Sequence, residues 1–434
     1  MKRSRWLEGA LTLLALGTAV SCSTLLGFEE LTVDESDGGV SDGSADGQPD
    51  GQPDAQPDVI PDVNPDALPD VQPDVQPDVQ PDVQPDVQPD VQPDVVDAPE
   101  EEVGCGDTQT DPDNCGRCGH GCAGGVCVDG MCKPYKLATL PDGAWGMAVG
   151  ETDVCVAIQL NNLMTCVNKT SGVLQWTGDN LAVTQPSWVA MDETNVYWSN
   201  RVSTSGSIGV CKIAGCTTPT KLIEPANRPN GIAVDATHVY WAETNGKTLK
   251  RAGKDGTGVE VIVSESLNFS PFLLVLHGGY VYFSERAAGK VARVPMAGGA
   301  VQVLGSSPAP SKVAVTQDWV FWTDSGSIGT IHRVPNADPP DGGSASTLFA
   351  SAQTGAFGIV ADEQYVYWIA SADSDVAEGA LRACPITGCQ GLPISLDEGV
   401  PYPMDVVMDD TALYYSIFGI DTAIDGEIRK VAKL

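Results

Sequence analysis

The sequence predicts an all-β repeat fold in its C-terminal two thirds, because one motif recurs there seven times. Each copy joins a short apolar strand, a polar turn and a second strand, which carries an aromatic pair in six copies. The apolar residues that open the second strands are 39 to 47 positions apart, the size of one four-stranded propeller blade. They are Val154, Val196, Val239, Val281, Val320, Val366 and Leu413.

The two ends of the repeat region predict how the ring closes. The last copy stops at Leu434 after its third strand, whereas the run from Tyr135 to Leu140 has the pattern of a fourth strand with no blade before it. Pairing these two segments completes the last blade and leaves no exposed sheet edge. We therefore expect a seven-bladed β-propeller over residues 133–434.

The motifs resemble two families of propeller repeat. The runs Val239 to Glu243 (VYWAE) and Val320 to Asp324 (VFWTD) resemble YWTD-type repeats, and Pro229 to Asp235 (PNGIAVD) resembles an NHL repeat. YWTD propellers have six blades, so six blades are the alternative to seven. The resemblance implies a propeller and says little about activity, because propellers carry many functions.

Two recurring features of the repeats have structural explanations. Asp192, Asp235, Asp362 and Asp409 follow first strands, where a carboxylate typically caps an Asx turn. The aromatic pairs recur at one position, which predicts packing between blades. These pairs are Tyr197-Trp198, Tyr240-Trp241, Tyr282-Phe283, Phe321-Trp322, Tyr367-Trp368 and Tyr414-Tyr415.

The N-terminus has the pattern of an export signal over residues 1–21. Lys2, Arg3 and Arg5 precede an apolar run that is too short to span a bilayer as a helix. The run ends in Ala-Val-Ser-Cys22, which resembles the bacterial lipobox, whose cysteine is acylated and becomes the mature N-terminus. The resemblance implies a lipid-anchored protein. A plain secretory signal with an incidental cysteine is the alternative.

Residues 22–104 form a predicted disordered linker. Residues 23–104 contain 23 of the 58 acidic residues and no lysine or arginine, and a QPDV-type tetrapeptide repeats from Gln48 to Val95. Regular prolines remove backbone donors and the aspartates repel each other, so no core can form. We expect an extended spacer with a polyproline II bias.

A cysteine-rich module follows over residues 105–132, with six cysteines in 28 residues. It is too small for a useful apolar core, so we expect disulfides to hold it together. Its NCGxCGxxC and CxxGxC pieces resemble the stigma-specific cysteine-rich family. Fifteen pairings are possible, and a zinc site using Cys115, Cys118, His120 and Cys122 is the alternative. The six cysteines are Cys105, Cys115, Cys118, Cys122, Cys127 and Cys132.

Six further cysteines lie in the repeats as close pairs. Without Cys22, the chain has an even number of cysteines, as expected for an exported protein. We expect local disulfides that join neighbouring strands or close the turns between third and fourth strands. The pairs are Cys155 with Cys166, Cys211 with Cys216, and Cys384 with Cys389.

The sequence contains no recognisable catalytic pattern. Motifs of the GxSxG, HExxH and P-loop type do not occur, and the repeats predict that His238, His277 and His332 lie apart. We therefore expect neither enzyme activity nor a metal or cofactor. Nucleic acid is not an expected partner, because residues 135–434 carry 30 acidic against 19 basic residues and no basic stripe.

The predicted binding face is the one at which the chain begins each innermost strand. This face also carries the loops between second and third strands, and long loops on a rigid scaffold often carry recognition. The longest of them are Ser199–Ser207, Ile369–Gly379 and Ser416–Gly426. Large side chains two positions before the strand anchors, together with the adjacent Trp188, are expected to be partly exposed around the mouth of the axis. Plain packing of the axial opening is the alternative. The candidates are Trp145, Trp188, Asn230, Phe272, Phe357 and Met404.

These observations predict a bacterial cell-envelope lipoprotein of the outer membrane or cell surface, anchored to membrane lipid through its acylated N-terminus. Its propeller is expected to bind a protein or polysaccharide partner. The alternatives are a structural or assembly factor of the envelope and, less favoured, a propeller enzyme of the lyase or lactonase type.

Overall fold

The computed structural model describes residues 105–178, 182–264, 269–339, 345–371, 378–389, 391–419 and 426–434. They belong to one compact unit, Val103–Leu434. The expected signal segment, the lipobox Cys22 and the acidic spacer lie outside the described residues. The described residues form strands and turns without helices, so none of them forms a helix that could cross a membrane.

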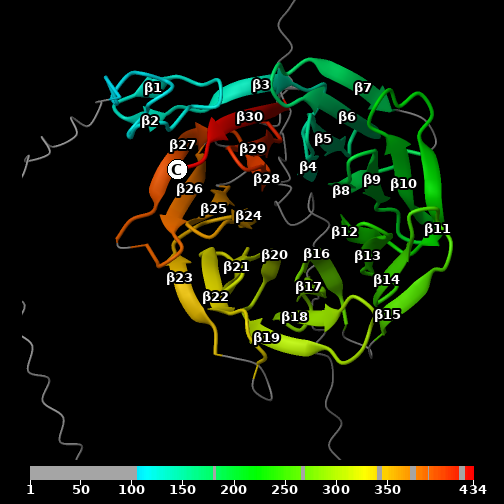
Figure 1. The fold of residues 1–434 in the computed structure, drawn as a ribbon. Coiled ribbons are helices and arrows are strands. Elements are labelled where there is room, and N and C mark those ends of the chain that lie inside the picture. Colours follow the sequence, from blue (N-terminus) through cyan, green and yellow to red (C-terminus); the bar gives the residue numbers. More distant parts are fainter. Residues whose placement is uncertain are drawn as a thin grey trace, which may run out of the picture. The chain divides into compact units, whose positions relative to one another are not determined.

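Seven four-stranded antiparallel sheets are arranged as blades around a central axis (Figure 1). The seven-bladed prediction is therefore confirmed. Blade 1 contains β4 (Met147–Val149), β5 (Asp153–Ile158), β6 (Leu163–Asn168) and β7 (Leu174–Gly178). Blade 2 contains β8 (Pro186–Met191), β9 (Asn195–Asn200), β10 (Gly206–Lys212) and β11 (Thr220–Ala226). Blade 3 contains β12 (Pro229–Val234), β13 (His238–Glu243), β14 (Thr248–Gly253) and β15 (Glu260–Ser264).

The remaining blades repeat this order, with the first strand of each innermost. Blade 4 contains β16 (Pro271–His277), β17 (Tyr280–Glu285), β18 (Lys290–Pro295) and β19 (Gln302–Ser306). Blade 5 contains β20 (Pro310–Val315), β21 (Trp319–Asp324), β22 (Thr330–Pro335) and β23 (Thr347–Ser351). Blade 6 contains β24 (Ala356–Ala361), β25 (Tyr365–Ala370), β26 (Gly379–Pro385) and β27 (Ile394–Val400).

Blade 7 joins the two ends of the propeller sequence. It contains β28 (Pro403–Met408), β29 (Ala412–Ile417), β30 (Glu427–Ala432) and β3 (Tyr135–Thr139). β3 pairs antiparallel with β30, and Tyr135 lies opposite Lys430. The N-terminal strand thus completes the last blade as predicted, which leaves β30 paired on both of its edges.

The aromatic pairs are buried in the core, as expected. Trp198, Trp241, Trp322 and Trp368 have no solvent exposure. Each indole N–H donates to a side-chain oxygen, as Trp241 does to Glu243 Oε1 at 2.9 Å. Burial of these large rings is therefore accompanied by satisfied polar atoms.

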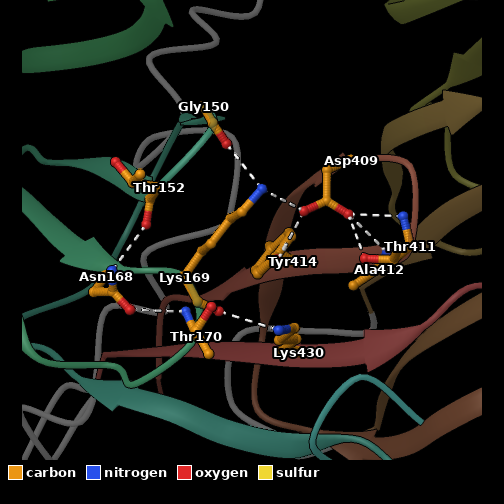
Figure 2. Close-up of polar contacts among 10 residues, drawn as sticks. All are labelled: Gly150, Thr152, Asn168, Lys169, Thr170, Asp409, Thr411, Ala412, Tyr414 and Lys430. Atoms are coloured by element: carbon orange, nitrogen blue, oxygen red, sulfur yellow. Dashed lines mark hydrogen bonds and ion pairs between the residues drawn. The ribbon is translucent and has the colours of Figure 1, made fainter. Parts of the chain in front are cut away.

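The predicted Asx turns are present in all four blades that carry the aspartate. In blade 7, Asp409 Oδ1 accepts from the backbone N–H groups of Thr411 and Ala412, both at 2.9 Å. The other carboxylate oxygen is used between blades, since Lys169 Nζ of blade 1 lies 2.9 Å from Asp409 Oδ2 (Figure 2). Lys254 with Asp192 and Lys433 with Asp362 repeat this ion pair.

All twelve cysteines of the described residues form disulfides. The pairs within the blades are the three that local spacing predicted. In the cysteine-rich module, Cys105 pairs with Cys118, Cys115 with Cys127, and Cys122 with Cys132. This pairing occupies the sulfur atoms that the alternative zinc site requires. The module's own strands are β1 (Cys127–Val128) and β2 (Met131–Cys132).

The cysteine-rich module contacts the propeller beside its C-terminus. Its disulfides cluster with Ala432, and Tyr135 Oη donates to Ala123 O at 3.2 Å. His120 Nε2 lies 2.7 Å from Lys433 O, and its Nδ1 lies 2.6 Å from Cys115 O. The module is thus tied to both strands that close the ring.

Candidate functional site at the propeller axis

The axis has two distinct ends, which we name by the direction of the innermost strands. The front face is where each innermost strand begins, and it also carries the loops between second and third strands. The back face is where each innermost strand ends, in the Asx turns. Within two of the three long loops of the front face, residues 372–377 and 420–425 lie outside the described residues.

The aromatic candidates at the front mouth are buried, so the prediction that they are partly exposed is wrong. Trp145, Trp188, Phe272 and Phe357 are only 5 to 8% exposed. Phe357 of blade 6 stacks on Trp188 of blade 2, with ring centroids 5.9 Å apart, and meets the edge of Phe272 of blade 4 at 6.3 Å. Three rings from alternate blades therefore form a plug across the axis.

At the level of the plug, glycines in several innermost strands make room for the neighbouring strand. Gly231 and Gly358 each occupy the position just before the strand anchor, where blade 2 has Trp188. A Cβ on Gly231 would lie 2.7 Å from Leu273 Cα, and one on Gly358 would lie 2.9 Å from Val406 N. Glycine thus lets neighbouring innermost strands approach closely and leaves the centre to the aromatic rings.

The other predicted binding residues are also buried. Trp145 packs edge-on against Phe418, with ring centroids 6.1 Å apart, and Met404 is 4% exposed. Asn230 donates to Thr244 Oγ1. Three buried polar atoms at this level have no hydrogen-bond partner among the described residues, namely Asn230 Oδ1, Ser187 Oγ and Trp145 Nε1. These candidates therefore belong to the packed wall of the mouth.

A cavity of about 400 Å³ lies behind the plug, between the seven innermost strands. Trp188 and Leu273 bound its front end, and the back end is formed by half-buried residues such as Val149, Val275 and Val315. Its wall is almost entirely aliphatic. Among the described residues that line it, Lys312 and Asp405 are the only charged ones.

Lys312 and Asp405 form an ion pair between blades 5 and 7 inside this cavity. Lys312 Nζ also donates to Val406 O at 3.0 Å. Asp405 Oδ2 accepts from Met147 N of blade 1 at 3.1 Å, and Oδ1 accepts from Val406 N at 2.9 Å. The carboxylate side chain is 1% exposed and the lysine side chain 19% exposed, so the lysine is the charged group that meets the cavity.

No local pattern in the sequence marks this pair. A lysine one position before a strand anchor resembles a surface residue, and nothing local relates it to an aspartate 93 positions later. The one signal was periodic. This position is otherwise occupied by glycine, leucine or tryptophan, so two charged residues there are exceptions.

Three arginines lie on the front face around the plug. Arg201 and Arg286 follow the second strands of blades 2 and 4, and Arg228 precedes β12. Burial, together with repulsion from Arg228 and Arg286, lowers the pKa of Arg201 to about 10. Burial also lowers the pKa of Arg286 to about 10, although Asp324 opposes the shift. Arg201 and Arg286 therefore remain cationic at neutral pH.

Arg286 is positioned by hydroxyl groups and by the plug. Its Nη2 donates to Ser325 Oγ at 3.0 Å, and Cζ lies 5.3 Å from the centroid of the Phe272 ring. Ser325 Oγ in turn lies 3.0 Å from Ser311 Oγ. The front face therefore presents half-buried guanidinium and hydroxyl groups over an aromatic base.

The histidines occupy separate positions, as expected. His332 stacks on Trp322 with ring centroids 5.5 Å apart, His238 lies beside Tyr240, and His277 lies beside Tyr282. Among the described residues, the one group of three metal-ligand side chains is Cys115, Cys122 and Cys127, whose sulfur atoms are in disulfides.

The chain matches no protein-family model and no curated protein. It is similar in structure to a catalytically inactive virginiamycin B lyase variant from Staphylococcus aureus with quinupristin, with TM-score 0.55, 14% identity, and coverage of 70% of this chain and 99% of that one. A streptogramin B lyase gives TM-score 0.52 at 13% identity, with 69% and 97% covered. U3-55K gives TM-score 0.53 at 9% identity, with 69% and 98% covered. At these identities the similarity shows the β-propeller fold alone.

Proposed function

We propose that this chain is a bacterial cell-envelope lipoprotein, anchored through Cys22, whose propeller binds an anionic polysaccharide at its front face. The observation that carries the proposal is the grouping of Arg201, Arg228 and Arg286 there. It occurs in a chain with a formal net charge of −34. Guanidinium groups bind carboxylates through paired hydrogen bonds, and hydroxyl and amide side chains suit sugar hydroxyls.

The burial of the aromatic side chains favours a polysaccharide over a protein partner. Protein interfaces take most of their binding energy from accessible aromatic and arginine anchors. Here Trp188, Phe272 and Phe357 are packed against each other and buried, so these three rings do not serve as accessible aromatic anchors of a protein interface.

Binding to polygalacturonate and to dextran tests the ligand class. Wild type should bind the anionic polygalacturonate but not the neutral dextran, and binding should weaken as salt is added. Arg201→Gln combined with Arg286→Gln should reduce the affinity at least tenfold. Arg333→Gln is the matched control, because this half-buried arginine lies on β22 and donates to Ile386 O at 2.8 Å in a turn of the back face. Equal binding of the two polymers would contradict the proposal.

Membrane fractionation tests the anchor. Cys22→Ser should move the protein from the membrane pellet to the soluble fraction, because the acylated sulfur is lost. A mutant that stays in the pellet like wild type would show that Cys22 is not the anchor.

A further inference from the structure

The axial cavity is separated from the front face by the aromatic plug. Trp188 belongs both to the plug and to the cavity wall. The residues at the opposite end, including Val149, Val275, Val315 and Met408, are half-buried. A molecule would therefore reach the cavity from the back face, which is opposite to the arginines of the proposed polysaccharide site.

The volume and lining of the cavity are those of a small-molecule site. About 400 Å³ lies at the lower end of the range for ligand pockets. An aliphatic wall with few convergent polar groups is also typical of such pockets. Cavities lined by apolar groups hold water poorly and accept apolar molecules.

The ion pair defines what the head group of a ligand must offer. An ammonium group has three donors, and within the described residues Lys312 Nζ uses two, toward Asp405 and Val406 O. Asp405 is covered and already accepts two backbone hydrogen bonds. The polar group left for a ligand is one N–H of Lys312, which requires an acceptor.

The charge balance favours an uncharged acceptor. Asp405 already neutralises Lys312, so a second carboxylate would place an uncompensated negative charge in an aliphatic cavity. An ammonium ligand would meet Lys312 with like charge. A carbonyl or ether oxygen accepts the hydrogen bond without either cost.

A purely structural role does not account for this pair. A buried ion pair is often no more stabilising than well-packed apolar residues of similar size. In the other blades this position holds Gly146, Trp188, Gly231, Leu273 or Gly358. We propose that the axial cavity binds a compact, uncharged, apolar molecule that places one carbonyl or ether oxygen against Lys312.

Three probes that share one adamantane cage test the head group, namely 1-adamantyl methyl ketone, adamantane-1-carboxylate and 1-adamantylammonium. Calorimetric titration of the full chain should give at least tenfold tighter binding of the ketone than of either ion. Lys312→Met combined with Asp405→Asn should remove this preference, because the donor and its counter-charge are both lost. Absence of ketone binding to wild type, or tighter binding of the carboxylate, would overturn the proposal.

Larger side chains in the cavity wall test whether the ketone binds in this cavity. Val275→Phe should weaken ketone binding at least tenfold, and Val315→Phe serves as a second filling variant if the first does not fold. Val261→Phe is the matched control, because Val261 lies on the outer strand β15 and is 53% exposed. Ketone binding that survives both filling variants would overturn the proposal. The filling variants should keep their affinity for polygalacturonate, so a failure of either site is recognised separately.

Discussion

The two ends of the propeller axis are built from the same strands but present opposite surfaces. At the front, three aromatic rings from alternate blades meet and close the axis under a group of arginines. Toward the back, the same strands carry small aliphatic residues and leave a cavity with one ion pair. The repeat supplies equivalent positions, and the choice of glycine, aromatic or charged residue in single blades makes the two ends different.

The largest expected loss of stability comes from removing β3, the strand that closes the propeller and so supports both ends of the axis. A chain that begins at Gly143 lacks β3, so β30 becomes an unpaired edge and blade 7 loses its outer strand. We expect its melting temperature to fall sharply or folding to fail. A chain that begins at Lys133 keeps β3 without the cysteine-rich module and controls for the loss of the module. Equal melting temperatures of the Gly143 and Lys133 chains would contradict the closure.

The next largest loss of stability is expected when an aromatic ring is removed from the plug at the front face. Phe357→Ala removes the ring that touches both Trp188 and Phe272, and it should lower the free energy of unfolding by about 3 to 5 kcal/mol. Denaturant unfolding measures this loss. Phe418→Ala is a comparison at the edge of the mouth, where the ring contacts Trp145 and Tyr402. A loss below about 1 kcal/mol for Phe357→Ala would show that the plug is not packed as described.

Removing only one partner of the ion pair in the cavity should lower the free energy of unfolding considerably. Lys312→Met leaves the Asp405 carboxylate buried without its counter-ion, and we expect a loss of about 3 kcal/mol. Adding Asp405→Asn should recover most of the loss, since the unpaired charge is then removed. Urea unfolding of the single and double variants measures both steps. Equal destabilisation by the two variants would mean that the ion pair contributes by geometry rather than by charge.

The smallest effect is expected at the rim of the back face, where Lys169 of blade 1 meets Asp409 of blade 7 (Figure 2). Lys169→Met should cost about 1 kcal/mol at neutral pH, because the pair is partly accessible to solvent. Its backbone carbonyl still accepts from Lys430 Nζ at 3.1 Å, so this contact is kept.

The pair of Lys169 and Asp409 should make the stability of the contact between blades 1 and 7 depend on pH. Although burial favours the neutral acid, hydrogen bonds from Lys169, Thr411 and Ala412 hold the pKa of Asp409 well below its usual range. A depressed pKa in the folded state stabilises the protein above the unfolded pKa, near 3.8, and this stabilisation is lost as pH falls toward the folded value. The difference between wild type and Lys169→Met should therefore shrink below about pH 4. A difference that stays constant to pH 2 would contradict this assignment.

The sequence alone determined the features that repeat or are local. A period of about 43 residues, the missing fourth strand after Leu434 and the orphan strand at Tyr135 were enough to predict seven blades and their closure. The Asx turns and the disulfides within blades were predictable because their partners lie within about a dozen positions along the chain. Short loops and strand alternation constrain such contacts strongly.

Only the tertiary structure decided which side chains meet across the axis. Trp188, Phe272 and Phe357 come from alternate blades. Whether these aromatic side chains are exposed or meet depends on the radius of the propeller and on the glycines of the innermost strands. The same reason hid the pair of Lys312 and Asp405 and the grouping of the arginines. Lys312 and Asp405 occupy the same repeat position in blades 5 and 7, but the repeat does not show which side chains meet across the axis. They become neighbours only when seven sheets close around one axis.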